Sequence, residues 1–337
     1  MIWRINLNNL LNNYPKLVQI KMLDLTIIVD FLLVLLSIIM LWKGADWLVD
    51  SAAEIAHSMH VSDLIIGLTV VAFGTSAPEF AVTISAAVSG QSEISIGNVI
   101  GSNIFNLGFI LGGTAMIRPI STDLKIFNRD GLFLLIVTTL IFFLFFGFDG
   151  WTPDDSFSQM EGIILFSLLI CYIVFLFIKK ETIESVNVKD AEFKTYVYFL
   201  IGLFAIVAGG HLMVTHASNI ARFFGVSDWI IAVTIVAAGT SAPELATSIT
   251  AAIKGRHGIA LGNLIGSDLF NLLGVLGLAG VINPTIIEEE IYFSVFNLIM
   301  MVGLVLLMMR IKWNISRTEG SILVFINLVR WYFDFAN

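Results

Sequence analysis

The feature that most constrains this chain is the motif GTSAPE, which occurs at residues 74–79 and again at 239–244 within apolar stretches. The proline of each copy lacks a backbone N–H, and its ring clashes with the carbonyl four residues earlier, so a continuous helix through it is disfavoured. We expect each helix to break at GTSA and to resume at the proline, with Thr75 or Ser76 capping the new helix in the first copy. The glutamate that ends each motif then lies inside an apolar stretch, where an ionised carboxylate is costly unless its charge is compensated.

Composition assigns the chain to the integral membrane proteins. Of its 337 residues 57% are apolar and 13% are charged, and the mean hydropathy is +0.91. These values lie outside the range of ordinary soluble domains. The single cysteine, Cys171, excludes an intramolecular disulfide. Ten stretches have the length and character of a membrane-spanning helix, which predicts an all-α fold: 25–43, 64–88, 94–115, 131–148, 160–179, 196–216, 228–253, 258–282, 291–309 and 319–333.

The two copies of the motif belong to an internal repeat. Residues 61–119 align without a gap with residues 226–284, an offset of 165 residues, and 32 of the 59 aligned positions are identical. Each half of the chain contains five predicted spans, and an odd number forces the second half to cross the bilayer in the opposite orientation. We therefore predict ten transmembrane helices in two inverted five-helix repeats, with helices 2 and 7 broken. Such repeats are typical of secondary transporters, whose binding site lies near the midplane between the halves.

The repeat divides the chain into an N-terminal extension of doubtful role (1–21), a first repeat (22–180), a short linker (181–195) and a second repeat (196–337). The extension is polar, rich in asparagine and lacks the features of a signal peptide. Either translation starts at Met22 or the extension is an appended segment. Thirteen of the 18 lysines and arginines fall on one side of the predicted spans, which makes that side cytoplasmic. Both termini are then expected outside, and the linker inside.

The residues that follow each motif complete an all-oxygen set of donor atoms. Asparagine and serine recur there at four-residue intervals, so they share one helix face: Asn98, Ser102 and Asn106 in the first repeat, and Asn263, Ser267 and Asn271 in the second. Carboxylate, hydroxyl, amide and carbonyl oxygens suit hard cations such as Ca²⁺, whereas softer metals recruit nitrogen or sulfur. The glycines beside these faces, at 97, 101, 262 and 266, predict a close helix approach.

Other classes of function find little support. With a net charge of −8 and no basic patch interleaved with aromatic residues, the chain is not expected to bind nucleic acid. Ser76 and Ser241 have no histidine or lysine nearby in the motif to act as a base, so we do not expect an enzyme. No cofactor and no obligatory protein partner is expected.

With GTSAPE followed by GNVIGSNIFN in one repeat and by GNLIGSDLFN in the other, the chain resembles the cation/Ca²⁺ exchanger superfamily, specifically the prokaryotic sodium/calcium exchangers. The similarity runs from about Met22 to the C-terminus. The resemblance implies that Glu79 and Glu244 are the central Ca²⁺ ligands, assisted by the backbone carbonyls of Thr75 and Thr240. It implies that the flanking Na⁺ ligands are Ser76, Ser102, Ser241, Ser267 and the carbonyls of Ala72 and Ala237. The polar pair that completes the central cluster would be Asn106 and Asn271.

The resemblance further implies an electrogenic secondary antiporter that exchanges Na⁺ for Ca²⁺ across the cytoplasmic membrane of a prokaryote by alternating access. Its partners would be Ca²⁺, Na⁺ and the lipid bilayer. Members that use K⁺ carry an aspartate at the position of Asn271, so exchange is expected to be K⁺-independent; Asp268 lies beside Ser267 and is predicted to face elsewhere. A Ca²⁺/H⁺ exchanger that uses the same glutamates is the alternative, because neighbouring carboxylates favour protonation of one another.

Overall fold

The computed structural model describes residues 16–146, 156–179, 190–226, 235, 237–287 and 289–336, and this part of the chain is mostly helical. The strands are β1 (Ile120–Ser121), β2 (Ser156–Phe157), β3 (Thr285–Ile286) and β4 (Asn314–Ile315), which pair antiparallel as β1 with β4 and β2 with β3. The α-helices are α2 (Lys16–Ser58), α3 (Asp63–Ile66), α4 (Ala72–Thr75), α5 (Ala77–Val88), α6 (Ser92–Phe105), α7 (Gly112–Ile117), α8 (Leu132–Phe146), α9 (Gln159–Ile178), α10 (Phe193–Phe223), α12 (Ala237–Thr240), α13 (Ala242–Ile253), α14 (His257–Leu269), α15 (Leu276–Ile282), α16 (Glu289–Lys312) and α17 (Arg317–Ala336). π-Helical segments with described bounds continue them: η1 (Gly67–Val71), η2 (Asn106–Leu111), η3 (Ile126–Gly131) and η5 (Phe270–Val275).

Within the described residues, seven helical spans are long and apolar enough to cross a membrane, and the bent pair Asp63–Thr75 and Ala77–Val88 makes an eighth. This confirms a mostly helical membrane fold. The predicted span at 319–333 falls in α17, which is helical but is not one of these eight. Part of the predicted span at 228–253, the extension up to residue 15 and most of the linker lie outside the described residues.

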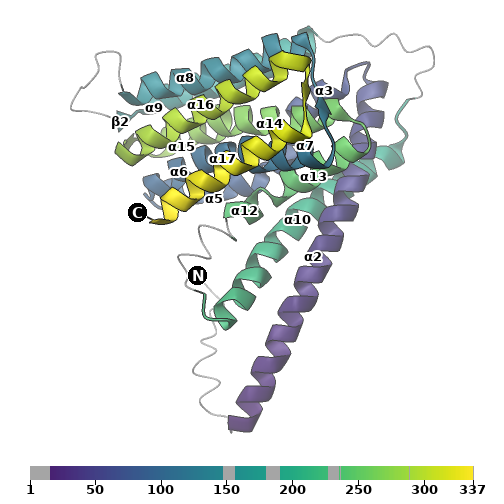
Figure 1. Ribbon diagram of the computed structural model, residues 1–337, viewed down its shortest axis with the longest axis vertical. Helices are drawn as coiled ribbons and strands as arrows, with labels where there is room; N and C mark the ends of the chain where they lie inside the picture. Colours follow the sequence, from purple (N-terminus) through teal and green to yellow (C-terminus); the bar gives the residue numbers. More distant parts are fainter. Residues whose placement is uncertain are drawn as a thin grey trace.

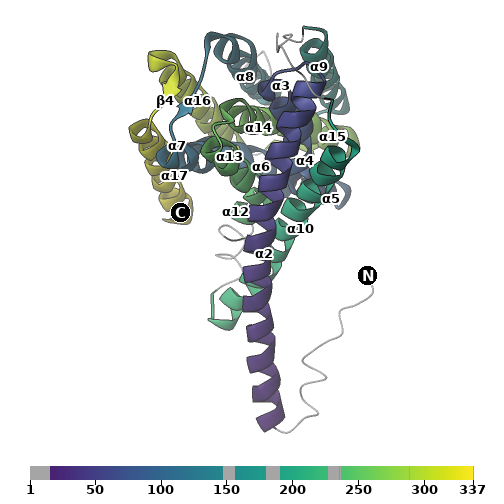
Figure 2. The same cartoon turned by 90° about the vertical axis from the view of Figure 1, so that its right-hand side faces the viewer.

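Helices α2 and α10 lie side by side and project away from the bundle that the other helices form (Figures 1 and 2). Glycines allow this close crossing. A Cβ placed on Gly202 would lie 2.7 Å from the backbone nitrogen of Leu48 and 2.8 Å from the carbonyl oxygen of Gly44. Because even a methyl group does not fit there, the two helices pack backbone to backbone and form one unit beside the bundle.

Helix α2 is longer than the predicted span, which ends at residue 43. Beyond that point its apolar residues continue on one face only. Leu48, Ala52 and Ala56 are fully buried, whereas Asp50 is exposed. The hydropathy of the stretch falls because of these polar positions, but the one-sided apolar pattern still supports a helix that packs along the bundle.

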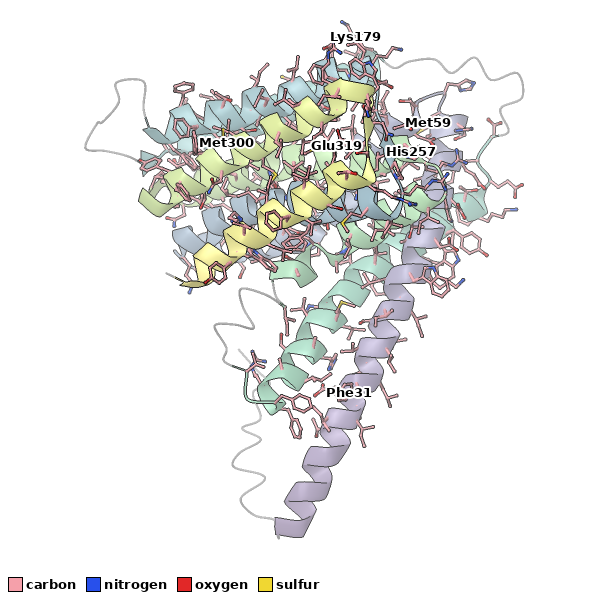
Figure 3. All side chains as sticks on the ribbon, viewed as in Figure 1. Phe31, Met59, Lys179, His257, Met300 and Glu319 are labelled. Carbon is pink, nitrogen blue, oxygen red and sulfur yellow. The ribbon has the colours of Figure 1, made fainter. Side chains whose placement is uncertain are left out.

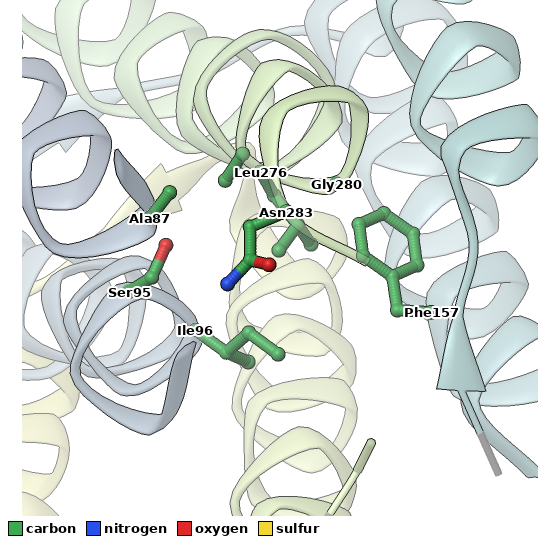
Figure 4. A pocket seen from close by; sticks show the side chains of 8 residues that line it. Ala87, Ser95, Ile96, Phe157, Leu276, Gly280 and Asn283 are labelled. Atoms are coloured by element: carbon green, nitrogen blue, oxygen red, sulfur yellow. The ribbon is translucent and has the colours of Figure 1, made fainter. Parts of the chain in front are cut away.

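The spans Ile94–Ile117 and His257–Ile282 form the centre of the bundle. In their most apolar 18-residue stretches 72% and 78% of the window is buried, whereas the share is only 28% for Gln159–Ile178, which lies at the periphery. The packing at the ends of the central helices is tight: α5, α6 and α15 enclose a cavity of only about 10 Å³ between Ser95, Phe157 and Asn283 (Figure 4). The stripes of asparagine and serine therefore face the interior of the protein.

The predicted close approach at Gly262 and Gly266 is confirmed. A Cβ on Gly262 would lie 2.7 Å from the carbonyl oxygen of Leu64 and 2.9 Å from the backbone nitrogen of Leu68, and a Cβ on Gly266 would lie 2.7 Å from the Cα of Leu68. For Gly97 and Gly101 the equivalent partner segment, 229–233 by the repeat offset, lies outside the described residues.

We expect Gly262→Ala to destabilise the protein by about 1–3 kcal/mol, because the added methyl group meets main-chain atoms that cannot move aside without shifting a helix. The thermal unfolding midpoint of the detergent-purified protein measures this effect. Gly303→Ala is the matched control, since no described atom lies within 4 Å of a Cβ at that position. An unchanged midpoint for Gly262→Ala would show that the two helices are less tightly packed than described.

Candidate cation-binding site

The predicted helix break is present at the first GTSAPE motif. The helix axis turns by 51° between Asp63–Thr75 and Ala77–Val88, and Ser76, at the corner, has left the helical region with φ −78° and ψ 8°. In the second copy Ser241 separates α12 from α13 with nearly the same angles, φ −88° and ψ 10°. In each copy the new helix starts one residue before the proline, and Glu79 and Glu244 lie in its first turn.

The two serines at the corners do not cap their own helices, and the capping prediction is wrong for Ser76. Its hydroxyl donates to Oε1 of Glu244 at 3.1 Å, and the hydroxyl of Ser241 donates to Oε1 of Glu79 at 2.9 Å. Both glutamates are 1% exposed. Donors to a buried carboxylate relieve a larger desolvation cost than a cap on a helix end does. Each motif therefore supplies a hydroxyl to the carboxylate of the other motif.

The second oxygen of each carboxylate has no donor. Oε2 of Glu79 and Oε2 of Glu244 are buried and lack a hydrogen-bond partner among the described residues. The same holds for Oδ1 of Asn106, Oδ1 of Asn271 and Oδ2 of Asp268. Buried polar atoms nearly always have a partner, so a group of five acceptors without donors calls for a positive species. A cation beside the two carboxylates would satisfy their second oxygens.

Asn98 and Asn263 support the motif helices. Asn98 donates through Nδ2 to Oγ1 of Thr83 at 2.9 Å and to the carbonyl oxygen of Glu79 at 3.4 Å. Asn263 repeats this pattern in the second copy, with Oγ of Ser248 at 3.0 Å and the carbonyl oxygen of Glu244 at 3.4 Å. Both side-chain amides therefore hold the first turns that carry the glutamates.

Hydroxyls of the first motif also reach the second repeat. Thr75 donates through Oγ1 to Oδ1 of Asn263 at 3.0 Å and lies 3.4 Å from Oγ of Ser267. Ser267 in turn donates to Oε1 of Glu244 at 3.4 Å. The carbonyl oxygen of Ala72 accepts hydrogen bonds from the backbone N–H of Ser76 at 3.0 Å and from Oγ1 of Thr75 at 3.3 Å.

The prediction that Asp268 faces elsewhere is wrong, because its side chain contacts a residue of the site. It is fully buried, and its Oδ1 accepts from Nδ2 of Asn106 at 3.0 Å. The equivalent residue of the first repeat is Asn103, whose Oδ1 accepts from Nδ2 of Asn271 at 3.1 Å. Asp268 thus holds a predicted ligand and adds a third carboxylate to the region. The spacing of three residues from Asp268 to Asn271, and from Asn103 to Asn106, was the available sequence signal, since it places both on one helix face.

The structure brings the predicted site residues together in the centre of the bundle, where α5, α6, α13 and α14 meet (Figure 1). Eleven of the twelve are buried, and the twelfth, Ala237, begins α12. The buried set is Glu79, Glu244, Thr75, Thr240, Ser76, Ser241, Ser102, Ser267, Asn106 and Asn271, together with Ala72. π-Helical turns follow in both repeats, η2 from Asn106 and η5 from Phe270, and such turns are frequent at functional sites.

Comparison with known proteins agrees with this geometry. The profile of the family described as "Sodium/calcium exchanger protein" matches residues 29–178 and 194–335. The chain belongs to this family. The sodium/calcium exchanger MaX1 of Methanosarcina acetivorans is 33% identical over 340 residues, with 88% of this chain and 96% of that protein covered. The putative antiporter CaxA of Alkalimonas amylolytica is 34% identical over 323 residues, which cover 92% of this chain and 100% of that protein.

Among solved structures, the sodium-calcium exchanger NCX_Mj, soaked with Na⁺ and without Ca²⁺, has a TM-score of 0.80 and 32% sequence identity to this chain. The match covers 90% of this chain and 98% of that structure. A further relative, the inner membrane protein YrbG of Escherichia coli, is 28% identical over 301 residues, which are 86% of this chain and 90% of that protein. This exchanger is therefore a multi-pass membrane protein with the fold of a cation/Ca²⁺ exchanger.

Proposed function

We propose that this exchanger is a K⁺-independent, electrogenic Na⁺/Ca²⁺ antiporter with ten transmembrane helices in two inverted repeats. The buried oxygens without donors among the described residues, on Glu79, Glu244, Asn106, Asn271 and Asp268, carry this proposal. All are hard donors of the kind that Ca²⁺ and Na⁺ prefer. The names of MaX1 and NCX_Mj support the choice of ions, because both are sodium/calcium exchangers.

The proposed ligands are the twelve site residues set out above, with the two glutamates at the centre. Because Ca²⁺ and Na⁺ compete for the same oxygens, one ion must leave before the other binds. A cycle that moves three Na⁺ against one Ca²⁺ carries one net charge across the membrane, so the exchange responds to voltage. The protein would lie in the cytoplasmic membrane, as the name of the inner membrane protein YrbG suggests. The distribution of lysine and arginine would place both termini outside.

Alternating access requires one part of the protein to move against another, and the unit formed by α2 and α10 is the proposed moving part. It projects beside the bundle and its two helices are packed too closely to separate (Figure 2). With the site empty, this unit would have to move past two carboxylates of α5 and α13 that are 1% exposed and lack a compensating ion. Only the occupied site would then allow the movement, which couples the two ions.

The test is ⁴⁵Ca²⁺ uptake into Na⁺-loaded proteoliposomes that contain the purified chain, at clamped voltage. We expect uptake that requires an outward Na⁺ gradient and that does not change when K⁺ replaces choline. Uptake should also speed up when the interior is made positive, because each cycle carries net positive charge outward. Uptake driven by a pH gradient without Na⁺ would instead establish Ca²⁺/H⁺ exchange at the same glutamates. Flux that needs no counter-ion would contradict both forms of antiport.

An ion pair fastens α2 to the bundle, and the proposed movement must break it. Nζ of Lys254, at the end of α13, lies 2.5 Å from Oδ1 of Asp46 and 2.7 Å from Oδ1 of Asp50. We expect Lys254→Gln to raise the population of the alternative position of α2 about 2- to 30-fold, since it removes two partly exposed ion pairs that contribute about 0.2–1 kcal/mol each. Distances between spin labels on α2 and α13 measure this population.

Lys43→Gln is the matched control for that measurement. Lys43 is exposed on α2, the helix that carries Asp46 and Asp50, and its ammonium group lies over the ring of Trp42. If both substitutions leave the distance distribution unchanged, the Lys254 pair does not restrain α2.

A further inference from the structure

Helix α17 lies on the outside of the bundle and carries a buried polar side chain that the proposed ligand set does not include. The helix runs along the bundle from near Glu319 to the C-terminal end (Figures 1 and 3). Phe325 and Leu328 are 66% and 49% exposed, whereas Asn327, between them, is 0% exposed. A buried amide is costly unless it is hydrogen-bonded, so Asn327 needs a partner inside the bundle.

That partner is the main chain of the helix that leads to Asn106. Nδ2 of Asn327 donates to the carbonyl oxygen of Ile104 at 3.1 Å, and its Oδ1 accepts from Nε of Arg330 at 3.3 Å. Gly108, one turn after Ile104, makes room for the amide, because a Cβ there would lie 2.6 Å from Cγ of Asn327. The side chain therefore reaches from α17 to the backbone of α6 and η2.

Asn327 bonds to this helix where its hydrogen-bond pattern changes. The N–H of Asn106 is shared between the carbonyl oxygens of Ser102 and Asn103, and from Asn106 onward the helix continues as η2. An α-helix bonds each N–H four residues back and a π-helix five residues back, so the ladder changes register at such a junction. The carbonyl of Ile104 belongs to this junction, and the bond from Asn327 fixes its position.

The turn that Asn327 fixes carries a proposed ligand. Asn106 lies two residues after Ile104 and is 1% exposed. Its Nδ2 donates to Oδ1 of Asp268 at 3.0 Å, and its Oδ1 has no hydrogen-bond partner among the described residues. Because Ile104 and Asn106 share one helical turn, a rotation of the backbone at Ile104 would turn the Asn106 amide away from Asp268.

The other repeat contains an equivalent of helix α17, namely α9. A Cβ on Gly320 of α17 would lie 2.5 Å from the carbonyl oxygen of Gly112, and a Cβ on Gly162 of α9 would lie 2.5 Å from that of Gly277. Gly112 and Gly277 are 165 residues apart, which is the offset of the repeat. Gly320 and Gly162 therefore occupy equivalent places.

This equivalence shows that packing does not require an amide at the place of Asn327. Seven residues after Gly320 stands Asn327, and seven residues after Gly162 stands Leu169. Leu169 is 5% exposed and packs against η5, with Cδ2 2.8 Å from a Cβ on Gly274. Leucine has the branched shape of asparagine without its polar atoms. The amide of Asn327 must therefore serve a purpose other than filling space.

We propose that Asn327 is a positioning residue of the cation site. Its hydrogen bond to the carbonyl of Ile104 holds the junction of α6 and η2 in the conformation that directs the side chain of Asn106 toward Asp268 and the bound cation. Asn327 does not touch the cation and acts only through Asn106. The inference rests on the proposed function, because Asn106 is a ligand only within that proposal.

The test is equilibrium binding of ⁴⁵Ca²⁺ to the full-length, detergent-purified chain. We expect Asn327→Leu to raise the Ca²⁺ concentration for half-saturation about 3- to 10-fold, the range that one interhelical hydrogen bond in a membrane protein contributes. Asn327→Ser should give a similar rise, because its short hydroxyl bonds within its own helix. The matched control is Tyr292→Phe, which removes a hydroxyl that donates to the carbonyl of Phe145 at 3.0 Å and should leave binding unchanged.

A double-variant cycle separates positioning from packing. In the Asn106→Ala background Asn327→Leu should have no further effect on half-saturation, because the residue through which it acts is gone. Unchanged half-saturation in Asn327→Leu, with or without a lower unfolding midpoint, would overturn the inference, and so would an equal fold-change in both backgrounds. An absence of Ca²⁺ binding by the unaltered chain would overturn the proposed function as well. Uptake that needs no Na⁺, together with the expected cycle, would overturn the driving ion alone.

Discussion

Glu79→Gln and Glu244→Gln should each reduce Na⁺-driven ⁴⁵Ca²⁺ uptake by about 100-fold or more. Each carboxylate is 1% exposed, accepts a hydroxyl hydrogen bond from the other repeat and has a second oxygen without a donor among the described residues. The glutamine side chain can still accept the hydrogen bond from the serine hydroxyl, but it presents an NH₂ group and no negative charge to a bound cation. Loss of one charged partner in a buried pair costs about 3–5 kcal/mol, which corresponds to a factor above 100.

The control for both substitutions is Glu319→Gln. Glu319 lies at the start of α17, where Oε2 accepts from Ser316 through N at 2.7 Å and Oγ at 2.6 Å, and glutamine also serves at this position of a capping box. Equal protein yields and unfolding midpoints for all three variants would tie the loss of uptake to the site. If either site variant keeps more than a tenth of the normal rate, that carboxylate is not a central ligand.

Asp268→Asn is the second substitution with a large expected effect. The asparagine can still accept from Nδ2 of Asn106, as Asn103 accepts from Asn271 in the other repeat, so the change removes a buried carboxyl group and little else. We expect half-saturation by Ca²⁺ to require a concentration about 10- to 100-fold higher, the usual effect of losing a group that supports a metal ligand.

The repeat offers a rescue for this variant. Asn103→Asp in the Asp268→Asn background returns one carboxylate to the equivalent place, against Asn271 in place of Asn106. If charge is what matters, the double variant should recover most of the affinity for Ca²⁺ that the single variant loses. Should Asp268→Asn leave Ca²⁺ saturation unchanged, the third carboxylate takes no part in cation binding.

Much of the site could be predicted because its causes are local. A proline within an apolar helix has the same steric consequence wherever the chain folds, and the break at Ser76 appears where the motif predicts it. The identity of the candidate ligands followed from residue type, since the stripes that contain Ser102 and Asn106 must face one way on a helix. The comparisons then supported the family that these motifs resemble.

The errors have a common origin in contacts between distant residues. Ser76 was expected to cap its own helix, but it donates to Glu244, 168 residues away. Asp268 was expected to face elsewhere, but its partner is Asn106, 162 residues away. Helix α2 outlasts its predicted span because its later apolar residues have a packing surface that hydropathy alone does not reveal.

The sequence by itself determined that the chain crosses membranes, that it is duplicated, that its helices break at GTSAPE and that the broken region is lined with oxygen donors. These properties follow from composition, from alignment of the chain with itself and from dihedral limits on single residues. Only the tertiary structure decided that each repeat donates hydroxyls to the glutamate of the other and that Asp268 supports the site. Those features are contacts between residues more than 150 positions apart in the sequence. Such contacts depend on how the whole bundle packs and not on the local conformational preferences of single residues.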